Sequence, residues 1–154
     1  MKIVIASDHA GFELKKYIMD NIDKNLYQVE DMGNFEFDIN DDYPDYIKKV
    51  AEFISQNDNV NEYRGVILGG SGQGENIVAN KYKNIRSVIV YGNDMELNTK
   101  IVSLSREHNN ANILSFGARF ITNENALNLL NIWLKKEFSN EERHIRRLSK
   151  INTD

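Results

Sequence analysis

Short apolar runs alternate along the chain with longer stretches in which apolar residues recur every three or four positions. The short runs predict buried strands at 2–6, 27–32, 66–68, 86–91 and 113–116. The longer stretches predict helices at 12–22, 44–54, 75–81, 95–107 and 123–138. Strands that alternate with helices in this way indicate an α/β protein with a doubly wound, mostly parallel five-stranded sheet of the Rossmann-like or flavodoxin-like kind.

The chain is long enough, at 154 residues, for one compact domain with its own core. We expect a single domain over 1–154, in which 139–154 form a C-terminal helical tail. A short helix beyond the last core element has little of its own chain to pack on. We therefore expect this tail to pack on a neighbouring subunit.

Composition and charge exclude several classes of protein. The chain has no cysteine, which excludes disulfides and thiolate catalysis. Its net charge of −4 argues against a general nucleic-acid-binding protein. No apolar run reaches membrane-spanning length, and the first residues lead into a strand without a signal-peptide pattern. We expect a cytoplasmic protein that binds neither nucleic acid nor membrane.

A glycine-rich loop joins the third strand to the third helix. Its glycines are Gly69, Gly70, Gly72 and Gly74. A strand, a glycine loop and a helix start direct free backbone N–H groups at one place, which favours an anion or a developing negative charge. The spacing is neither that of a dinucleotide fingerprint nor that of a P-loop. The alternative is a plain tight turn.

Candidate catalytic groups stand in the loops that follow strands. Glu75 lies where the glycine loop enters the helix, and an acid beside an anion-stabilising loop suggests proton abstraction next to a carbonyl. Asp8 and His9 follow the first strand, and Arg119 follows the fifth. Loops after parallel strands share one edge of the sheet, so these groups could converge there. The alternatives are that Glu75 only complements a helix N-terminus and that Asp8 only caps a helix.

Two charged segments admit simpler interpretations. The acidic residues at 38–42 lack the spacing and the glycine of a calcium loop, so we expect a solvated loop there. In the tail, Arg143 and Arg147 lie one turn apart on the same face if the segment is helical. Two guanidinium groups on one face suit a phosphate group. The alternative is a solvated basic helix end.

Several motifs, in this order along the chain, together resemble the ribose-5-phosphate isomerase B family. They are Ser7–Gly11, Asp42–Tyr46, Gly69–Glu75, Ala79–Lys81, Ile85–Arg86, Ser105–Asn109, Phe116–Arg119, and Arg143–His144 with Arg146–Arg147. The family also includes allose-6-phosphate isomerases and the subunits of galactose-6-phosphate isomerase. The resemblance implies interconversion of ribose 5-phosphate and ribulose 5-phosphate through an enediolate, without a metal or an organic cofactor.

The base differs between two branches of this family. One branch uses a cysteine at the start of the glycine loop, where this chain has Gly69. The other uses a glutamate just after the loop, and Glu75 matches it. The resemblance implies that Glu75 takes the C2 proton and returns it to C1, while backbone N–H groups around Ser71 stabilise the enediolate oxygen.

The resemblance also implies roles for the other candidate residues. His108 would donate a proton in opening the sugar ring, with Asp8 nearby. The sugar would be held by Asn109, Gly70, Gly72, Gln73 and Gly74, and Tyr43 would approach it from the side. The phosphate or its neighbouring hydroxyls would be surrounded by His9, Arg119, Arg143 and Arg147. Family members are homodimers whose sites combine residues of both subunits, so we expect a homodimer or a tetramer.

One segment departs from the family pattern. The stretch 91–104, which leads to His108, is longer than in other members, and a longer approach could change which sugar fits. An isomerase of a six-carbon sugar phosphate, such as allose 6-phosphate or galactose 6-phosphate, is therefore an alternative. A further alternative is a flavodoxin-like module that binds a phosphorylated ligand without catalysis.

Overall fold

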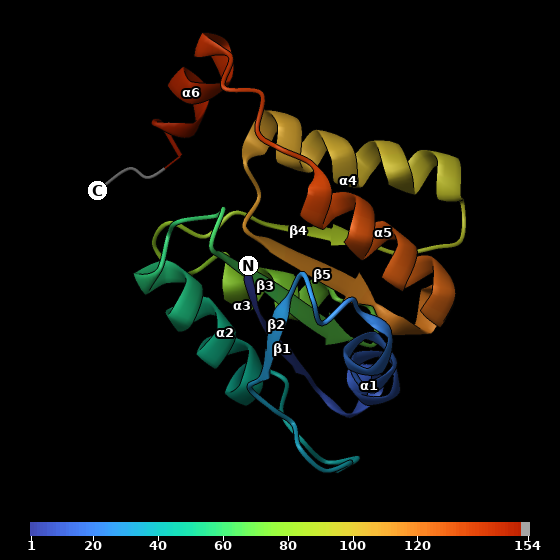
Figure 1. The fold of residues 1–154 in the computed structure, drawn as a ribbon. Helices are drawn as coiled ribbons and strands as arrows, with labels where there is room; N and C mark the ends of the chain where they lie inside the picture. Colours follow the sequence, from blue (N-terminus) through green and yellow to red (C-terminus); the bar gives the residue numbers. More distant parts are fainter. Residues whose placement is uncertain (152–154) are drawn as a thin grey trace.

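The computed structural model describes residues 1–151, which form a five-stranded sheet covered by helices on both faces (Figure 1). The strands are β1 (Lys2–Ser7), β2 (Gln28–Asp31), β3 (Tyr63–Gly69), β4 (Ser87–Val90) and β5 (Ile113–Gly117). Their order is β2-β1-β3-β5-β4, and every neighbouring pair is parallel. The predicted α/β fold is confirmed, and the sheet is parallel throughout rather than mostly parallel.

Helices follow the strands as expected. They are α1 (Phe12–Asn21), α2 (Pro44–Gln56), α3 (Gln73–Ala79), α4 (Met95–Asn109), α5 (Asn123–Lys135) and α6 (Glu142–Leu148), with short 3-10 helices η1 (His9–Gly11) and η2 (Ala118–Phe120). Several boundaries of helices and strands differ from the sequence prediction by one to three residues, as α3 and α5 illustrate. α3 begins two residues earlier, at Gln73, because Gly72 takes the left-handed conformation of its N-cap. α5 ends at Lys135 rather than at 138.

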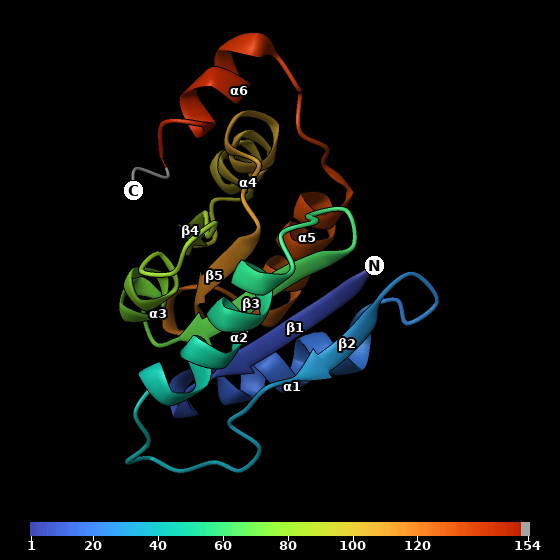
Figure 2. The ribbon, with the colours of Figure 1, turned by 90° about the vertical axis from the view of Figure 1, so that its left-hand side faces the viewer.

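Each face of the sheet has its own apolar core. One core joins the sheet to α1, α4 and α5 through residues such as Leu14, Val102 and Trp133, all of them buried. The other joins it to α2 and α3 through residues such as Val50 and Ala79. Figure 2 shows the helices on either side of the strands. Within 1–151, no helix has the length and apolar character needed to cross a membrane.

The side on which successive strands join the sheet changes at β1. From β1 the chain moves outward to β2 and then returns to β3 on the other side of β1. The loops after β1 and β3 therefore leave the same edge of the sheet in opposite directions, which is where α/β proteins form a ligand crevice. This topology brings the segment after Ser7 next to the glycine loop after Gly69.

The C-terminal segment is helical, as expected, and α6 packs partly on its own chain. The ring of His144 is buried and stacks on His108 of α4, with ring centroids 4.3 Å apart and planes at 12°. Lys136, just before the tail, pairs with Glu107 at 2.8 Å. The remainder of α6 stands out beyond α4 (Figures 1 and 2). Residues 152–154 of the expected tail lie outside the described part, and packing on a neighbouring subunit stays a prediction.

One buried cation connects β3 to α5. Arg64 is 2% exposed, and its guanidinium donates to the carbonyl oxygens of Val60, Trp133 and Leu134 at 2.8–3.0 Å. It also lies 5.1 Å from the centre of the Trp133 ring. These carbonyls include two at the end of α5, which have no partner within the helix. Arg64 therefore supplies the hydrogen-bond donors that the carbonyl groups at the C-terminal end of α5 lack.

We predict that Arg64→Met lowers the free energy of unfolding by about 2–4 kcal/mol, because methionine leaves buried carbonyl groups without donors. Chemical denaturation of the variant and the wild type measures the difference. Arg146→Met is the matched control, since Arg146 is exposed on α6, and we expect it to change stability by less than about 0.5 kcal/mol. Equal stability of the two variants would show that Arg64 does not hold α5 in place.

Candidate active site

The loop after β3 turns sharply into α3 and leaves main-chain N–H groups facing the edge of the sheet. Gly72 has φ 74°, and a Cβ there would lie 2.9 Å from the Phe116 backbone, so the position needs glycine on both counts. The hydroxyl of Ser71 accepts from the N–H of Gln73 at 3.3 Å. The first N–H groups of a helix have no carbonyl partner within it, so this turn can donate to an anion or an oxyanion.

Glu75 in the first turn of α3 directs its carboxylate back against the end of β3. It is 4% exposed. A Cβ on Gly69 would lie 1.8 Å from Glu75 Oε1, so only glycine leaves room for the carboxylate there. Burial raises the pKa of Glu75, its own backbone N–H partly offsets this, and the nearby charge of Asp8 raises the pKa further. The result is a desolvated carboxyl group beside unpaired main-chain donors.

Asp8 lies at the end of β1, in the crevice beside Glu75. Its Oδ1 accepts from the Gly11 N–H at 3.0 Å, so the expected capping role is confirmed. Asp8 is nonetheless 7% exposed, and burial raises its pKa above the ordinary value. Its backbone N–H donates to the Leu68 carbonyl at 3.3 Å, which joins the loops after β1 and β3. Asp8 and Glu75 are therefore two buried carboxyl groups that share one crevice.

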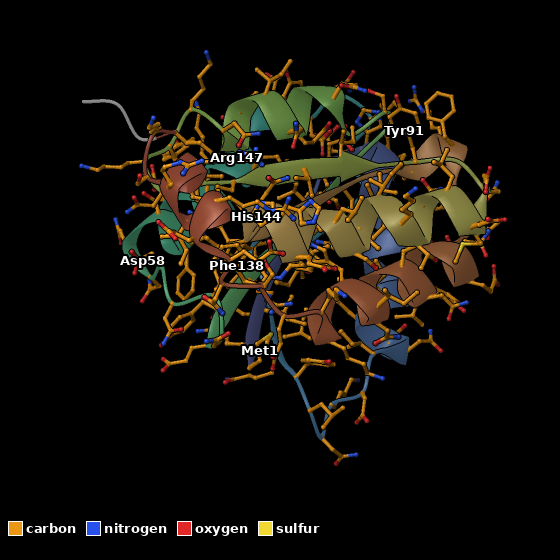
Figure 3. All side chains as sticks on the ribbon, turned by 90° about the horizontal axis from the view of Figure 1, so that it is seen from above. Met1, Asp58, Tyr91, Phe138, His144 and Arg147 are labelled. Carbon is orange, nitrogen blue, oxygen red and sulfur yellow. The ribbon has the colours of Figure 1, made fainter. Side chains whose placement is uncertain are left out.

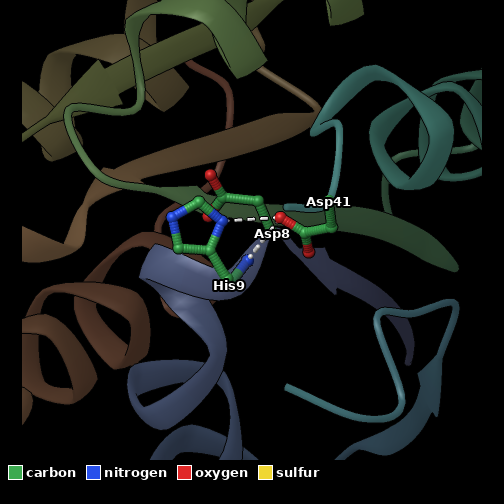
Figure 4. A group of neighbouring side chains, drawn as sticks. All are labelled: Asp8, His9 and Asp41. Atoms are coloured by element: carbon green, nitrogen blue, oxygen red, sulfur yellow. Dashed lines mark hydrogen bonds and ion pairs between the residues drawn. The ribbon is translucent and has the colours of Figure 1, made fainter. Parts of the chain in front are cut away.

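His9 is held by Asp41, which belongs to the acidic segment 38–42 that the sequence predicts to be a solvated loop. Asp41 Oδ1 lies 2.6 Å from His9 Nδ1 and accepts from the His9 backbone N–H at 3.1 Å (Figure 4). The expectation of a solvated loop is wrong for Asp41, whose side chain is 2% exposed. The topology contains a signal for this contact. The loop leaves β2 and returns to α2 at the same sheet edge, so its last residues must come back beside His9.

Two more predicted residues, Arg119 and Tyr43, lie around the glycine loop. The backbone N–H of Arg119 donates to the Gly70 carbonyl at 3.1 Å, and its guanidinium lies over Gly70, where a Cβ would be 3.2 Å from Cζ. The Tyr43 ring borders Gly74 from the side of α2, since a Cβ at that glycine would lie 2.7 Å from Tyr43 Cζ. Within one protomer the structure thus brings Tyr43 and Arg119 to the loop that holds Glu75.

The long segment before His108 extends α4 instead of forming a loose loop. Asp94 caps α4 by accepting from the Leu97 N–H at 3.0 Å, and Asn98 donates to the carbonyl of Gly92 at 2.8 Å. This fixes Tyr91 at the rim, where the exposed side chain of Gln73 reaches its hydroxyl at 3.5 Å. The segment thus places Tyr91 beside Gln73 of the glycine loop, and the expectation that it changes which sugar fits stays a prediction.

Four predicted residues lie at the other end of the sheet. They are His108 and Asn109 at the end of α4, and Arg143 and Arg147 on α6. α4 ends just before Ile113 begins β5, whereas Gly117 at the end of β5 pairs with Gly69. Four residue steps of about 3.3 Å separate these ends by about 13 Å. In Figure 3, His144 and Arg147 on α6 lie toward one end of the molecule and Tyr91 toward the other. One protomer does not bring the four residues to Glu75.

Among residues 1–151, one group could offer ligand atoms to a metal ion: Asp8, His9 and Asp41, whose ligand atoms lie within 4.8 Å of one another. The His9 nitrogen and the Asp41 oxygen already bond to each other at 2.6 Å. An ion would have to replace that hydrogen bond. The sequence-based expectation that the site needs neither a metal nor an organic cofactor stays a prediction.

Comparison with known proteins matches residues 3–151 to the family model described as Ribose/Galactose Isomerase. The chain is 36% identical to a probable ribose-5-phosphate isomerase B of Mycoplasma genitalium, over 97% of this chain and 92% of that protein. It is 35% identical to the ribose-5-phosphate isomerase B of Mycolicibacterium paratuberculosis, over 96% of this chain and 87% of that protein.

Solved structures agree with this match. The crystal structure of Mycoplasma genitalium ribose-5-phosphate isomerase B with bound ribulose-5-phosphate superposes with a TM-score of 0.88 at 36% identity, over 97% of this chain and 93% of that one. The Clostridium thermocellum ribose-5-phosphate isomerase B gives a TM-score of 0.86 at 39% identity, over 98% of this chain and 95% of that one.

We predict that Glu75→Gln stabilises the fold at neutral pH. The folded-state pKa of Glu75 is raised, so the wild type loses stability as pH rises through that pKa, because the buried carboxyl must ionise. Glutamine does not ionise. The melting temperature of Glu75→Gln should therefore exceed that of the wild type at pH 8, and the difference should shrink at pH 4.5. Thermal unfolding at both pH values measures this, with the exposed Glu13→Gln as control. A less stable Glu75→Gln at pH 8 would contradict the desolvated carboxylate.

Proposed function

The chain belongs to the Ribose/Galactose Isomerase family, and we propose that Glu75 is the base with which its site interconverts ribose 5-phosphate and ribulose 5-phosphate. The protein is an aldose–ketose isomerase, since relatives over nearly its full length are ribose-5-phosphate isomerases B and one of their structures holds ribulose-5-phosphate. The observation that supports Glu75 as the base is that its carboxylate is buried and packed beside the main-chain N–H groups after β3.

The proposed reaction moves one proton between adjacent carbons. Glu75 removes the proton from C2 of the open-chain aldose, and the C–H electron pair forms the C1–C2 double bond of an enediolate. As that double bond forms, the electrons of the C1 carbonyl move onto O1. The carboxyl group then returns the proton to C1, while the proton of the C2 hydroxyl passes to O1, so that C1 becomes the alcohol and C2 the ketone. Glu75 has a pKa raised by burial, which makes its carboxylate a stronger base. N–H groups around Ser71 stabilise the negative oxygen.

The local geometry explains why cysteine and glutamate are alternative bases in this family. A side chain at position 69 would start 1.8 Å from Glu75 Oε1, so a cysteine there and this carboxylate would compete for the same space. With Gly69, the space that would hold a thiol is filled by a carboxylate from the next helix turn. Both arrangements would place a base at the carboxyl end of β3, beside the same loop.

We infer that the site is completed by a second copy of this chain. Leu97, Ile101 and Leu104 form a stripe along α4, and these apolar side chains are 53%, 38% and 36% exposed. α4 is about 22 Å long, from 15 residues at about 1.5 Å each. Two copies that pack these stripes antiparallel about a two-fold axis would bring the His108 end of one α4 toward the strand-end edge of the other.

This arrangement gives roles to the four residues that lie far from Glu75 within one protomer. His108 of a second copy would donate the proton that opens the ring, beside Asp8, and its Asn109 would hold the sugar. Arg143 and Arg147, one turn apart on α6, would bind the phosphate opposite His9 and Arg119. The choice between a homodimer and a tetramer, and the cytoplasmic location, stay predictions.

A direct assay with ribose 5-phosphate tests the activity, and the same assay with allose 6-phosphate tests the six-carbon alternative. Specificity is a ratio of kcat/KM values, and the rim built by Tyr91 and Gln73 is where a longer sugar would differ in contact. We expect kcat/KM to be higher for ribose 5-phosphate. A higher value for allose 6-phosphate would assign the enzyme to the six-carbon alternative.

We predict that Glu75→Gln lowers kcat on ribose 5-phosphate by about 10²–10⁴-fold, because glutamine cannot accept the C2 proton. KM should change by less than about threefold, since the amide keeps the size of the side chain. Steady-state kinetics measures both values. Glu62→Gln is the matched control, since Glu62 is exposed before β3, and it should leave kcat unchanged. Turnover by Glu75→Gln at the wild-type rate would refute the base assignment.

We predict that two inactive variants, Glu75→Gln and His108→Gln, restore activity when co-expressed. In a mixed dimer one site receives both changes and the other receives neither. If dimers form at random, about a quarter of all sites are intact, so about a quarter of the wild-type activity should return. Native mass spectrometry verifies the mixed dimers. Verified mixed dimers without activity would show that Glu75 and His108 act from the same protomer.

A further inference from the structure

We propose that Asp41 is a positioning residue that fixes the ring of His9, so that His9 Nε2 faces the phosphate of the substrate. This proposal rests on the proposed function, because it assigns His9 to the phosphate. The side-chain hydrogen bonds of Asp41 go to His9 and Asn34. Its contribution would be to the orientation of His9, and through it to substrate affinity.

The contact between the two residues has two parts. Oδ1 of Asp41 accepts from the His9 backbone N–H at 3.1 Å and lies 2.6 Å from the ring nitrogen Nδ1. One carboxylate oxygen therefore holds both the main chain and the ring of the same residue. Figure 4 shows Nδ1 facing Asp41 and the second ring nitrogen directed away from it. The ring cannot flip without breaking the Nδ1 contact.

Asp41 is in turn fixed from behind by Asn34. Asn34 Nδ2 donates to the other oxygen of Asp41, Oδ2, at 2.9 Å, and its Oδ1 accepts from the Ser7 hydroxyl at 3.2 Å. The carbonyl of Asn34 accepts from the ammonium group of Lys15, which also pairs with Asp31 at 2.8 Å. Asn34 and Lys15 are each 2% exposed. A chain of buried partners thus runs from α1 to His9.

A second contact to the His9 ring comes from an aromatic side chain. Phe37, from the same loop as Asp41, lies edge-on to the His9 ring with centroids 6.2 Å apart and planes at 89°. Phe37 also packs on Phe12 at the start of α1, at 6.3 Å. The loop therefore holds His9 with a carboxylate and an aromatic ring. These two contacts restrict the orientation of the His9 ring more than that of a solvated surface histidine.

The chemistry of the pair determines which nitrogen carries hydrogen. A carboxylate only accepts, so Nδ1 must carry a hydrogen, and Nε2 is left for the ligand. A phosphate oxygen also accepts, so an Nε2–H group that donates to it makes the ring an imidazolium, with Asp41 as its counter-ion. η1, which carries His9, packs against η2, which carries Arg119. Both cationic groups thus stand at the same end of the crevice.

Charge alone and positioning predict opposite signs for the loss of Asp41. Removing a negative charge near a phosphate site should strengthen anion binding if only Coulombic repulsion matters. If Asp41 orients His9, its removal should weaken binding, because the ring becomes free to turn away. The sign of the change in phosphate affinity therefore separates the two accounts without relying on its size.

The experiment uses Asp41→Ala and Asp41→Asn, with Asp38→Asn as the matched control. Asp38 is exposed in the same loop, and its side chain accepts from the Asn40 N–H, a bond that asparagine can keep. We expect Asp41→Ala to raise KM and the inhibition constant of inorganic phosphate about tenfold, with kcat within about threefold. Asp41→Asn should recover part of the loss, since its carboxamide oxygen can accept from Nδ1–H. Asp38→Asn should match the wild type.

Unchanged or tighter phosphate binding by Asp41→Ala would overturn the proposal, and so would an equal effect of Asp38→Asn. Circular dichroism of each variant establishes that it is folded. Should Asp41→Ala fail to fold, Asp41→Asn carries the test alone. A loss of wild-type activity on treatment with EDTA, restored by a divalent cation, would also overturn it, since Asp8, His9 and Asp41 would then serve an ion.

A second measurement does not depend on catalysis. The chain has three histidines, so ring nitrogen signals in a ¹⁵N-labelled sample can be assigned with a His9→Gln variant. We expect the ring hydrogen of the neutral imidazole on Nδ1 in the wild type and a shift toward Nε2–H in Asp41→Ala. The same tautomer in both would overturn the proposal. If the wild type does not turn over sugar phosphates, the proposed function fails while this readout still decides whether Asp41 orients His9.

Discussion

The site depends on the missing side chain at Gly69. Because no Cβ occupies the end of β3, the carboxylate of Glu75 folds back from α3 into space where a Cβ would lie 1.8 Å from it. There it loses water and gains basicity, and it lies beside the N–H groups of the glycine loop. In the proposed mechanism, the packing that disfavours the charge in the folded protein also prepares Glu75 for proton transfer, so stability would be given up for chemistry at this position.

The polarity of the parallel sheet distributes the remaining groups. Loops after strands gather at one edge, which places Asp8, Glu75 and Arg119 together, while α4 runs back and carries His108 to the other end. If Glu75 is the base and His108 the ring-opening acid, as we propose, a single protomer of this fold has the base without the acid. An exposed apolar stripe of about the right length lies between the two ends, on α4. In the proposed dimer, catalysis requires association, because the surface that joins the two copies also completes each active site.

Much of this arrangement could be predicted from the sequence. Periodicity was enough for all five strands and for the order of the helices, and the glycine loop with Glu75 indicated the chemistry. Asp41 could not be distinguished from its exposed neighbour Asp38, because polarity describes a residue and not the direction in which its loop folds. Arg64 similarly reads as a surface charge before a strand, although it satisfies carbonyls that lie 69 and 70 residues away. Such contacts exist only after the chain has closed on itself.

The central claim is that Glu75 carries hydrogen between C2 and C1 as a proton. The most direct measurement is NMR detection of solvent deuterium in the carbon-bound positions of ribose 5-phosphate and ribulose 5-phosphate recovered after incubation in D₂O. The account predicts that the wild type incorporates deuterium at these carbons and that Glu75→Gln does not. Equal incorporation by both proteins, or turnover by the wild type with none at all, would contradict it.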